Sequence, residues 1–122
     1  MQTGTRRVVL VGTGFVGMSF AYSMVNQGGA EELVLIDVNH EKAVGEAMDL
    51  NRGIPFGPEK IEIWAGDYSD CKTADIVVVT AGVNQQLGET RLALVERNAK
   101  IMRDVIKNVM QSGFNGILLI AS

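Results

Sequence analysis

The chain has 122 residues, of which 47% are hydrophobic and 20% charged, and this balance predicts one folded domain rather than a disordered chain. Eleven basic and fourteen acidic side chains give a net charge of −3, which argues against nucleic acid or an anionic membrane as a partner. The sequence has neither an apolar run of the roughly 18 residues that span a membrane nor a secretory signal pattern. A single cysteine, Cys71, excludes an internal disulfide, so we expect a cytoplasmic protein.

Apolar strand-like runs and helical segments alternate along the chain. In order, the pattern predicts a strand at 8–11, a helix at 15–27, a strand at 33–36, a helix from 40 to about 51, strands at 61–63 and 76–80, a long helix at 92–109 and a strand at 117–120. Four of the strands are fully apolar, whereas Ile61-Glu62-Ile63 alternates and predicts a half-exposed strand. The first helix has so narrow a polar stripe that we expect it to be covered on more than one side.

Glycine, proline and capping residues mark the ends of these segments. Asn39 is expected to cap the second helix, which places Ala43, Ala47 and Leu50 on one face. Residues 53–58 read as a loop, and the polar, glycine-containing segment 82–90 is expected to be a mobile loop. The long helix carries an apolar stripe at Leu92, Val95, Ala99, Met102, Ile106 and Val109.

This alternation predicts an α/β fold, a doubly wound parallel sheet of about five strands with helices on both faces. In the strand order 3-2-1-4-5 the strand at 117–120 would be an open edge. It has none of the charges or prolines that edge strands usually carry, and the chain stops two residues later. We therefore expect residues 1–122 to form one domain that is incomplete.

The most informative motif is a G-x-G-x-x-G turn at residues 12–17, between the first strand and the first helix. Gly12 permits the tight turn, Gly14 lets the backbone approach a pyrophosphate, and Gly17 lets the helix pack closely on the sheet. Asp37 lies 20 residues past Gly17 at the end of the second strand, where its carboxylate can accept from ribose hydroxyls. It would repel a 2′-phosphate, so NAD is favoured over NADP. The alternative is that these are ordinary turn glycines beside a helix-flanking aspartate.

Several segments together resemble the bacterial L-lactate dehydrogenases. They are Val8-Val9-Leu10-Val11-Gly12-Thr13-Gly14-Phe15-Val16-Gly17, Leu35-Ile36-Asp37, Gly66-Asp67-Tyr68 and Ala81-Gly82-Val83-Asn84-Gln85-Gln86-Leu87-Gly88-Glu89-Thr90-Arg91. The resemblance runs from Arg7 to Ser122 and implies an NAD-binding Rossmann domain. It also implies that the NAD site includes Val16, Asp37, Lys42, Tyr68, Gly82, Val83 and Ser122, with Asp104 near the nicotinamide side.

The same resemblance implies a substrate loop after the fourth strand. Gln85 and Arg91 would face the substrate when the loop closes, and Arg91 would act catalytically by polarising the substrate carbonyl. Leu87 stands where the family often has proline, which affects the expected stiffness of the loop. The family's catalytic histidine, its paired aspartate and its carboxylate-binding arginine would lie beyond Ser122. Alone, the chain is therefore expected to bind NAD but not to turn over.

The leading interpretation is the NAD-binding part of an L-lactate dehydrogenase that interconverts pyruvate and L-lactate. A malate dehydrogenase shares the fold but would need an arginine at position 85 for the second substrate carboxylate, where this chain has Gln85. A free-standing NAD-sensing module is a third alternative, and it leaves Gln85 and Arg91 unexplained. The resemblance also implies a homo-oligomer with the helix at 43–51 at a subunit interface.

Other reactive side chains have simpler explanations. His40, the only histidine, stands at a helix start near the adenosine end, where a solvated residue is expected rather than a catalyst. Cys71 has no histidine or second thiol nearby in the sequence, so a catalytic role is disfavoured. No Cys/His set has metal-ligand spacing, so no metal site is expected.

Overall fold

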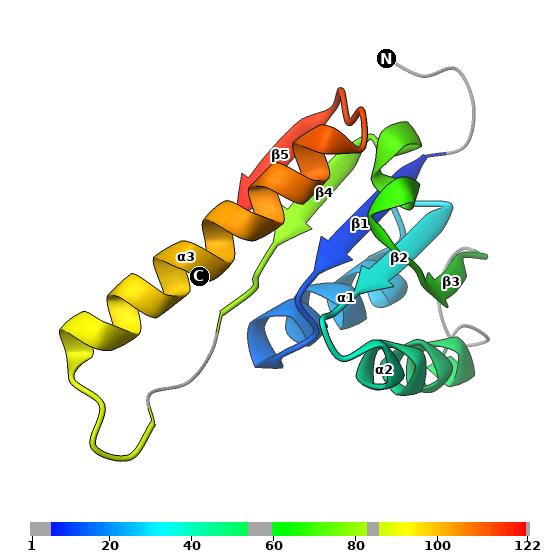
Figure 1. The fold of residues 1–122 in the computed structure, drawn as a ribbon. Helices are drawn as coiled ribbons and strands as arrows, with labels where there is room; N and C mark the ends of the chain where they lie inside the picture. Colours follow the sequence, from blue (N-terminus) through cyan, green and yellow to red (C-terminus); the bar gives the residue numbers. More distant parts are fainter. Residues whose placement is uncertain (1–5, 54–59, 83–85, 122) are drawn as a thin grey trace.

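A computed structural model describes residues 6–53, 60–82 and 86–121, which form a sheet flanked by helices (Figure 1). The strands are β1 (Arg7–Val11), β2 (Glu32–Ile36), β3 (Glu62–Ala65), β4 (Ile76–Val79) and β5 (Ile117–Ile120). The helices are α1 (Phe15–Gln27), α2 (His40–Gly53) and α3 (Arg91–Gln111), with a 3-10 helix η2 (Tyr68–Thr73) between β3 and β4.

All strand pairs are parallel, and the strand order is β3-β2-β1-β4-β5. β1 lies at the centre, with Val9 beside Val34 of β2 and Val77 of β4. The predicted α/β class, the five parallel strands and their order are therefore confirmed. In this order β2 follows β1 on one side and β4 lies on its other side. The connections that leave β1 and β4 therefore run in opposite directions, which makes the carboxyl ends of these two strands the topological switch point of the sheet.

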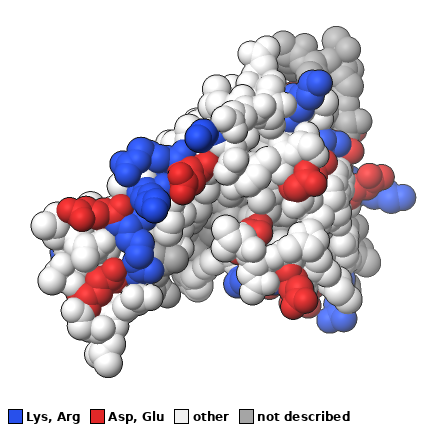
Figure 2. Space-filling model, in the orientation of Figure 1, with Lys and Arg blue, Asp and Glu red and all other residues white. Residues whose placement is uncertain are grey.

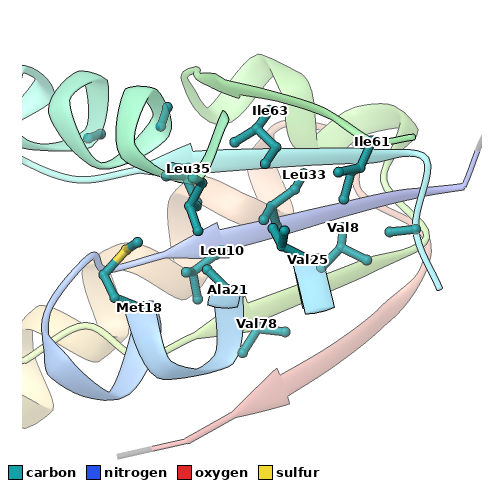
Figure 3. Packing of buried hydrophobic residues seen from close by; sticks show 14 residues of the cluster. Val8, Leu10, Met18, Ala21, Val25, Leu33, Leu35, Ile61, Ile63 and Val78 are labelled. Atoms are coloured by element: carbon teal, nitrogen blue, oxygen red, sulfur yellow. The ribbon is translucent and has the colours of Figure 1, made fainter. Parts of the chain in front are cut away.

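Helices cover both faces of the sheet, as a doubly wound fold requires. Alternate residues of β1 point to opposite faces, so Leu10 packs with α1 and α2 while Val9 packs with η2 and α3. Figure 3 shows the first of these two clusters, with Met18 and Ala21 of α1 against the strands. Because the two clusters clamp the sheet from both sides, the ends of the strands are held in fixed positions for a site at their carboxyl edge.

The helix ends follow the signals in the sequence. α1 spans the predicted residues and ends at Gly28, whose φ of 77° is favourable for glycine. Asn39 caps α2 as predicted, since its side-chain oxygen accepts from the Lys42 amide at 3.2 Å. The Thr90 hydroxyl accepts from the Ala93 amide and caps α3.

Two expectations differ from the structure. α1 is covered on one side within the described residues, because Phe15, Val16 and Tyr22 stay exposed although they are apolar. The 3-10 helix η2 was not predicted, since it is shorter than the periods that reveal a helix. Its local signal is a capping box, in which the Asp67 side chain accepts from the backbone amide of Asp70 and the Asp70 side chain accepts from the backbone amide of Asp67. The predicted loop at 53–58 lies mostly outside the described residues.

Candidate functional site

The turn between β1 and α1 is built around two tightly packed glycines. Gly12 has a φ of 103°, and a Cβ there would lie 2.8 Å from the backbone nitrogen of Ala81. A Cβ on Gly17 would lie 2.1 Å from the Gly12 carbonyl oxygen and 2.6 Å from the Thr80 hydroxyl. The Thr80 hydroxyl donates to the Gly12 carbonyl at 2.9 Å. The turn, the first helix and the end of β4 therefore fit together only without side chains at these two positions.

Gly14 is the opposite case. It is exposed, and a Cβ built on it would have no heavy atom within 4 Å. It is also the N-cap of α1, where it supplies no side-chain acceptor, and the first turn has no acidic residue. The amides that begin α1 therefore face an open approach, the arrangement in which a helix N-terminus binds phosphate.

Asp37 directly follows β2 and accepts three hydrogen bonds, two of them from this turn. Its Oδ2 accepts from the Thr13 amide at 2.9 Å and from the Thr13 hydroxyl at 2.5 Å, and its Oδ1 accepts from the Asn39 amide at 2.9 Å. Burial raises the pKa of the Asp37 carboxyl, but these hydrogen bonds and the charge of Lys42 outweigh it and hold the pKa below its ordinary value. At neutral pH Asp37 is thus a fixed anionic acceptor.

Lys42, on the first turn of α2, reaches the same threonine from the other side. Its Nζ donates to the Thr13 carbonyl oxygen, lies 3.4 Å from the Thr13 hydroxyl and forms an ion pair with Glu46 at 3.7 Å. Thr13 is thereby hydrogen-bonded to both the Asp37 carboxylate and the Lys42 ammonium. The three predicted residues Gly14, Asp37 and Lys42 lie around one turn.

A cleft of about 900 Å³ opens at the carboxyl ends of β1 and β4. Its walls come from the β1–α1 turn, the segment after β4, one face of α3 and the end of β5. The lining residues are Gly14, Phe15, Val16, Thr80, Ala81, Gly82, Val95, Asn98, Ala99, Met102, Ile120 and Ala121. The cleft lies at the topological switch point of the sheet, which is where open α/β sheets bind ligands. Its size and mostly apolar walls suit a ligand with flat rings.

The structure separates the predicted residues into three groups. The first is gathered around the turn and the cleft and comprises Gly12, Gly14, Val16, Gly17, Asp37, Lys42 and Gly82. The second is described but lies off the cleft walls and comprises Tyr68, Arg91 and Asp104. The third lies outside the described residues and comprises Val83, Gln85 and Ser122.

Each residue of the second group has a definite place. Tyr68 begins η2 and packs against the α3 side of the core; burial, then the nearby Cys71 and Asp37, raise the pKa of its phenol. Arg91 is the exposed first residue of α3. Asp104 is also exposed on α3, about 200° around the helix from Met102 and so on a different face from the cleft. Figure 2 shows basic side chains gathered along α3, interleaved with acidic ones.

Sequence reasoning missed two parts of the site. The cleft wall on α3 has the spacing of a single helix face, at Val95, Asn98, Ala99 and Met102, but the apolar stripe in the sequence does not indicate that part of it lines a cleft. The hydroxyls of Thr13 and Thr80 were also missed. Their partners lie 24 and 68 residues away, and no local pattern indicates such contacts.

The remaining reactive groups are explained without catalysis. His40 is exposed at the start of α2. Cys71 is fully buried, and burial followed by the charges of Asp70 and Asp67 raises the pKa of its thiol to about 11, so it is not a nucleophile at neutral pH. Within residues 6–53, 60–82 and 86–121, no group of three or more His, Cys, Asp or Glu side chains is placed to hold a metal ion. No helix in these ranges is long and apolar enough to cross a membrane.

Comparison with known proteins gives consistent matches. The sequence profile of the lactate/malate dehydrogenase NAD-binding domain matches residues 6–122. L-lactate dehydrogenase 2 of Bacillus cereus (strain ATCC 10987 / NRS 248) is 60% identical over all 122 residues, and L-lactate dehydrogenase 1 of the same strain is 59% identical. The chain spans about 39% of the length of these relatives.

Solved structures agree with the fold. The minor L-lactate dehydrogenase of Enterococcus mundtii in its ligand-bound form superposes with a TM-score of 0.94 at 58% identity, over 97% of this chain and 38% of that one. A lactate dehydrogenase from a Medee basin deep-sea metagenome library superposes with a TM-score of 0.92 at 66% identity, with the same coverage.

Proposed function

Because the chain belongs to the lactate/malate dehydrogenase family as its NAD-binding domain, we propose that it forms the coenzyme-binding part of an L-lactate dehydrogenase. The observation that carries this proposal is the arrangement of Gly14 and Asp37 around one turn. Open amides at the start of α1 can hold a pyrophosphate, while the fixed carboxylate can accept from the hydroxyls of a ribose. The pyrophosphate and the ribose of a dinucleotide thus each have a binding group, the amides of α1 for the first and the Asp37 carboxylate for the second.

The residues fit NAD rather than its 2′-phosphorylated form. Asp37 is ionised at neutral pH and lies where the adenosine ribose would be recognised, so a 2′-phosphate there would meet a negative charge. NADH, when bound, supplies the hydride for reduction of a carbonyl. The chain's own contribution is to bind and orient it: Gly14 leaves room for the pyrophosphate, and Val16, Ala99 and Met102 give the cleft apolar walls that exclude water.

The test of the coenzyme proposal is the ratio of the dissociation constants for NADPH and NADH. Wild type is expected to bind NADH more tightly, and Asp37→Ser is expected to narrow the ratio because the repelling carboxylate is gone. Glu62→Ser is the matched control, since Glu62 is an exposed acid at the start of β3 that does not line the cleft. Equal affinity of the unmutated protein for both coenzymes would refute the proposal.

For the substrate, we propose pyruvate and L-lactate, which would be recognised by Gln85, after β4 in the sequence, and by Arg91, the first residue of α3. A guanidinium at Arg91 would stabilise negative charge on the carbonyl oxygen as it is reduced. Gln85 is neutral, so it tolerates the methyl group of pyruvate but cannot balance the second carboxylate of oxaloacetate. Relatives with 59–60% identity carry the name L-lactate dehydrogenase, which favours this choice over malate dehydrogenase.

The substrate proposal is tested with Gln85→Arg in the whole polypeptide that the gene encodes. The variant should shift preference strongly toward oxaloacetate, by about 10³ in the ratio of kcat/KM values, because the new guanidinium pairs with the added carboxylate. It should also lower pyruvate turnover. A wild type that already favours oxaloacetate, or a variant with unchanged preference, would remove the lactate assignment. NADH binding with no turnover of either acid would instead indicate a coenzyme-sensing module.

We further propose a cytoplasmic homo-oligomer in which the outer side of α2 forms a subunit interface. Val44 and Met48 are exposed on that side, next to a hollow of about 380 Å³. Exposed apolar side chains beside a hollow are typical of a contact surface. Sedimentation velocity of wild type and Met48→Glu tests this: the variant should dissociate at concentrations where the wild type is associated, and a monomeric wild type would contradict it.

A further inference from the structure

Thr13 occupies a variable position of the G-x-G-x-x-G motif, where the backbone geometry of the turn does not require a threonine. Gly12 and Gly17 of the motif are glycines for reasons of φ or space, whereas Thr13 carries a hydroxyl and is only 1% exposed. A buried hydroxyl needs a partner, because leaving it without one is costly. The partner here is the carboxylate of Asp37, which follows β2 and lies 24 residues along the chain.

The hydrogen bonds of Asp37 are divided unequally between its two oxygens. Oδ2 accepts two bonds, both from Thr13, at 2.9 Å from the amide and 2.5 Å from the hydroxyl. Oδ1 accepts one, from the Asn39 amide at 2.9 Å. A carboxylate oxygen has room for about two donors. Thr13 thus saturates one oxygen, and the acceptor position left over is on the other.

Thr13 also fixes the nearest cation. Lys42 Nζ donates to the Thr13 carbonyl oxygen and lies 3.4 Å from its hydroxyl. If the Asp37 carboxylate lost one of its bonds to Thr13, it could rotate toward this ammonium and pair with it. That pairing would take the acceptor away from a ribose and would also neutralise the charge that repels a 2′-phosphate.

We propose that Thr13 is a positioning residue for coenzyme choice: its hydroxyl and amide hold Asp37 by one oxygen, apart from Lys42, and so present the other oxygen to an unphosphorylated adenosine ribose. This inference rests on the proposed function, because it takes Asp37 to be the ribose acceptor. It adds to that function a residue outside the carboxylate itself that sets the preference for NADH over NADPH.

The test is Thr13→Val, which removes the hydroxyl and keeps the shape, the amide and the carbonyl that Lys42 uses. NADH should bind about three- to tenfold more weakly, the range that one lost hydrogen bond of ordinary strength corresponds to. NADPH should lose less, so that the ratio of the two dissociation constants narrows. Thr13→Ser restores the hydroxyl and should restore the ratio. Coenzyme fluorescence titrations of wild type and the two variants measure all six dissociation constants.

A second readout needs no coenzyme. The Thr13 hydroxyl is one of the hydrogen bonds that lower the pKa of Asp37, so the carboxyl pKa followed by carbon NMR should rise in Thr13→Val and return in Thr13→Ser. Thr80→Val is the matched control, because it removes a hydroxyl that bonds to Gly12 in the same turn but does not touch Asp37. It should weaken both coenzymes alike and leave the ratio unchanged.

Two results in Thr13→Val would overturn this inference alone. An unchanged ratio of the two dissociation constants, while Asp37→Ser narrows that ratio, would make Thr13 a merely structural part of the turn. Tighter NADH binding would mean that the hydroxyl competes with the ribose for Asp37. A wild type without preference for NADH would overturn the proposed function as well. Thr13→Ala carries the same comparison if Thr13→Val does not fold.

Discussion

Gly14 and Gly17 stand three residues apart in one turn, and the structure predicts that adding a methyl group to each has opposite consequences. In Gly17→Ala the new Cβ would lie 2.1 Å from the Gly12 carbonyl oxygen and 2.6 Å from the Thr80 hydroxyl. In Gly14→Ala it would meet no heavy atom within 4 Å, and the backbone at φ −78° and ψ −167° is open to alanine. One change should damage the fold, and the other should damage only the binding of a ligand.

The magnitudes follow from these distances. The Gly17 contact is with backbone, so α1 or the turn must move by about 1 Å or more, which costs about 3 kcal/mol as overpacking does elsewhere. For a domain of this size that corresponds to a fall of roughly 10 °C in Tm. Gly14→Ala should stay within about 1 kcal/mol of wild type, because the weaker N-cap is offset by the stiffer unfolded chain. Its Cβ would occupy the approach of the pyrophosphate and weaken NADH binding at least about 30-fold.

Thermal unfolding and NADH titration on the two variants and wild type separate these effects. The expected pattern is a low Tm for Gly17→Ala, and a wild-type Tm with lost binding for Gly14→Ala. An unchanged Tm in Gly17→Ala would show that the turn has room for a methyl group at position 17. Wild-type NADH affinity in Gly14→Ala would show that the phosphate binds somewhere other than this turn.

Three further predictions concern other parts of the chain. The fold favours the protonated form of Cys71, so the free energy of unfolding should be unchanged below the ordinary pKa of 9.0 and fall as the pH rises through about 11. The buried thiol should not react with a disulfide reagent at pH 7, and rapid labelling of the native protein would contradict this. Arg97→Lys breaks the paired contacts to Glu89 at 2.8 and 3.0 Å and should lower Tm by about 2–4 °C, whereas an unchanged Tm would mean that the pair does not hold the loop. The 122-residue chain expressed alone should self-associate through β5, where Leu119 is 48% exposed, and Leu119→Lys should reduce this in sedimentation velocity; a stable dilute monomer of the unmutated chain would argue against it.

The sequence was sufficient for the fold because its signals are local. Buried parallel strands read as short apolar runs, and glycines or capping residues mark the helix ends, so α1 could be placed to the residue. Right-handed crossovers between parallel strands restrict the topology, and the doubly wound order 3-2-1-4-5 satisfies this restriction. Gly12 and Asp37 could be singled out for the same reason, because a turn that needs positive φ and an acid after the next strand both leave a pattern in the sequence.

Contacts between distant segments could not be read in this way. Thr13 looks like any turn residue until its hydroxyl is seen on Asp37, 24 positions away. The apolar stripe of α3 gives no sign of where the core ends and the cleft begins, since Met102 faces the cleft while Val105 is buried. The exposure of Phe15 is equally invisible, because apolar residues that line a ligand site and those that fill a core have the same chemistry.

A crystal structure of the protein with NADH would show directly whether this turn and cleft hold the coenzyme. We expect the pyrophosphate at the open amides that follow Gly14 and an adenosine ribose hydroxyl within hydrogen-bond distance of Asp37, with Thr13 still bonded to Oδ2. A coenzyme bound elsewhere, such as the hollow on the outer side of α2, or a ribose that does not contact Asp37, would contradict it.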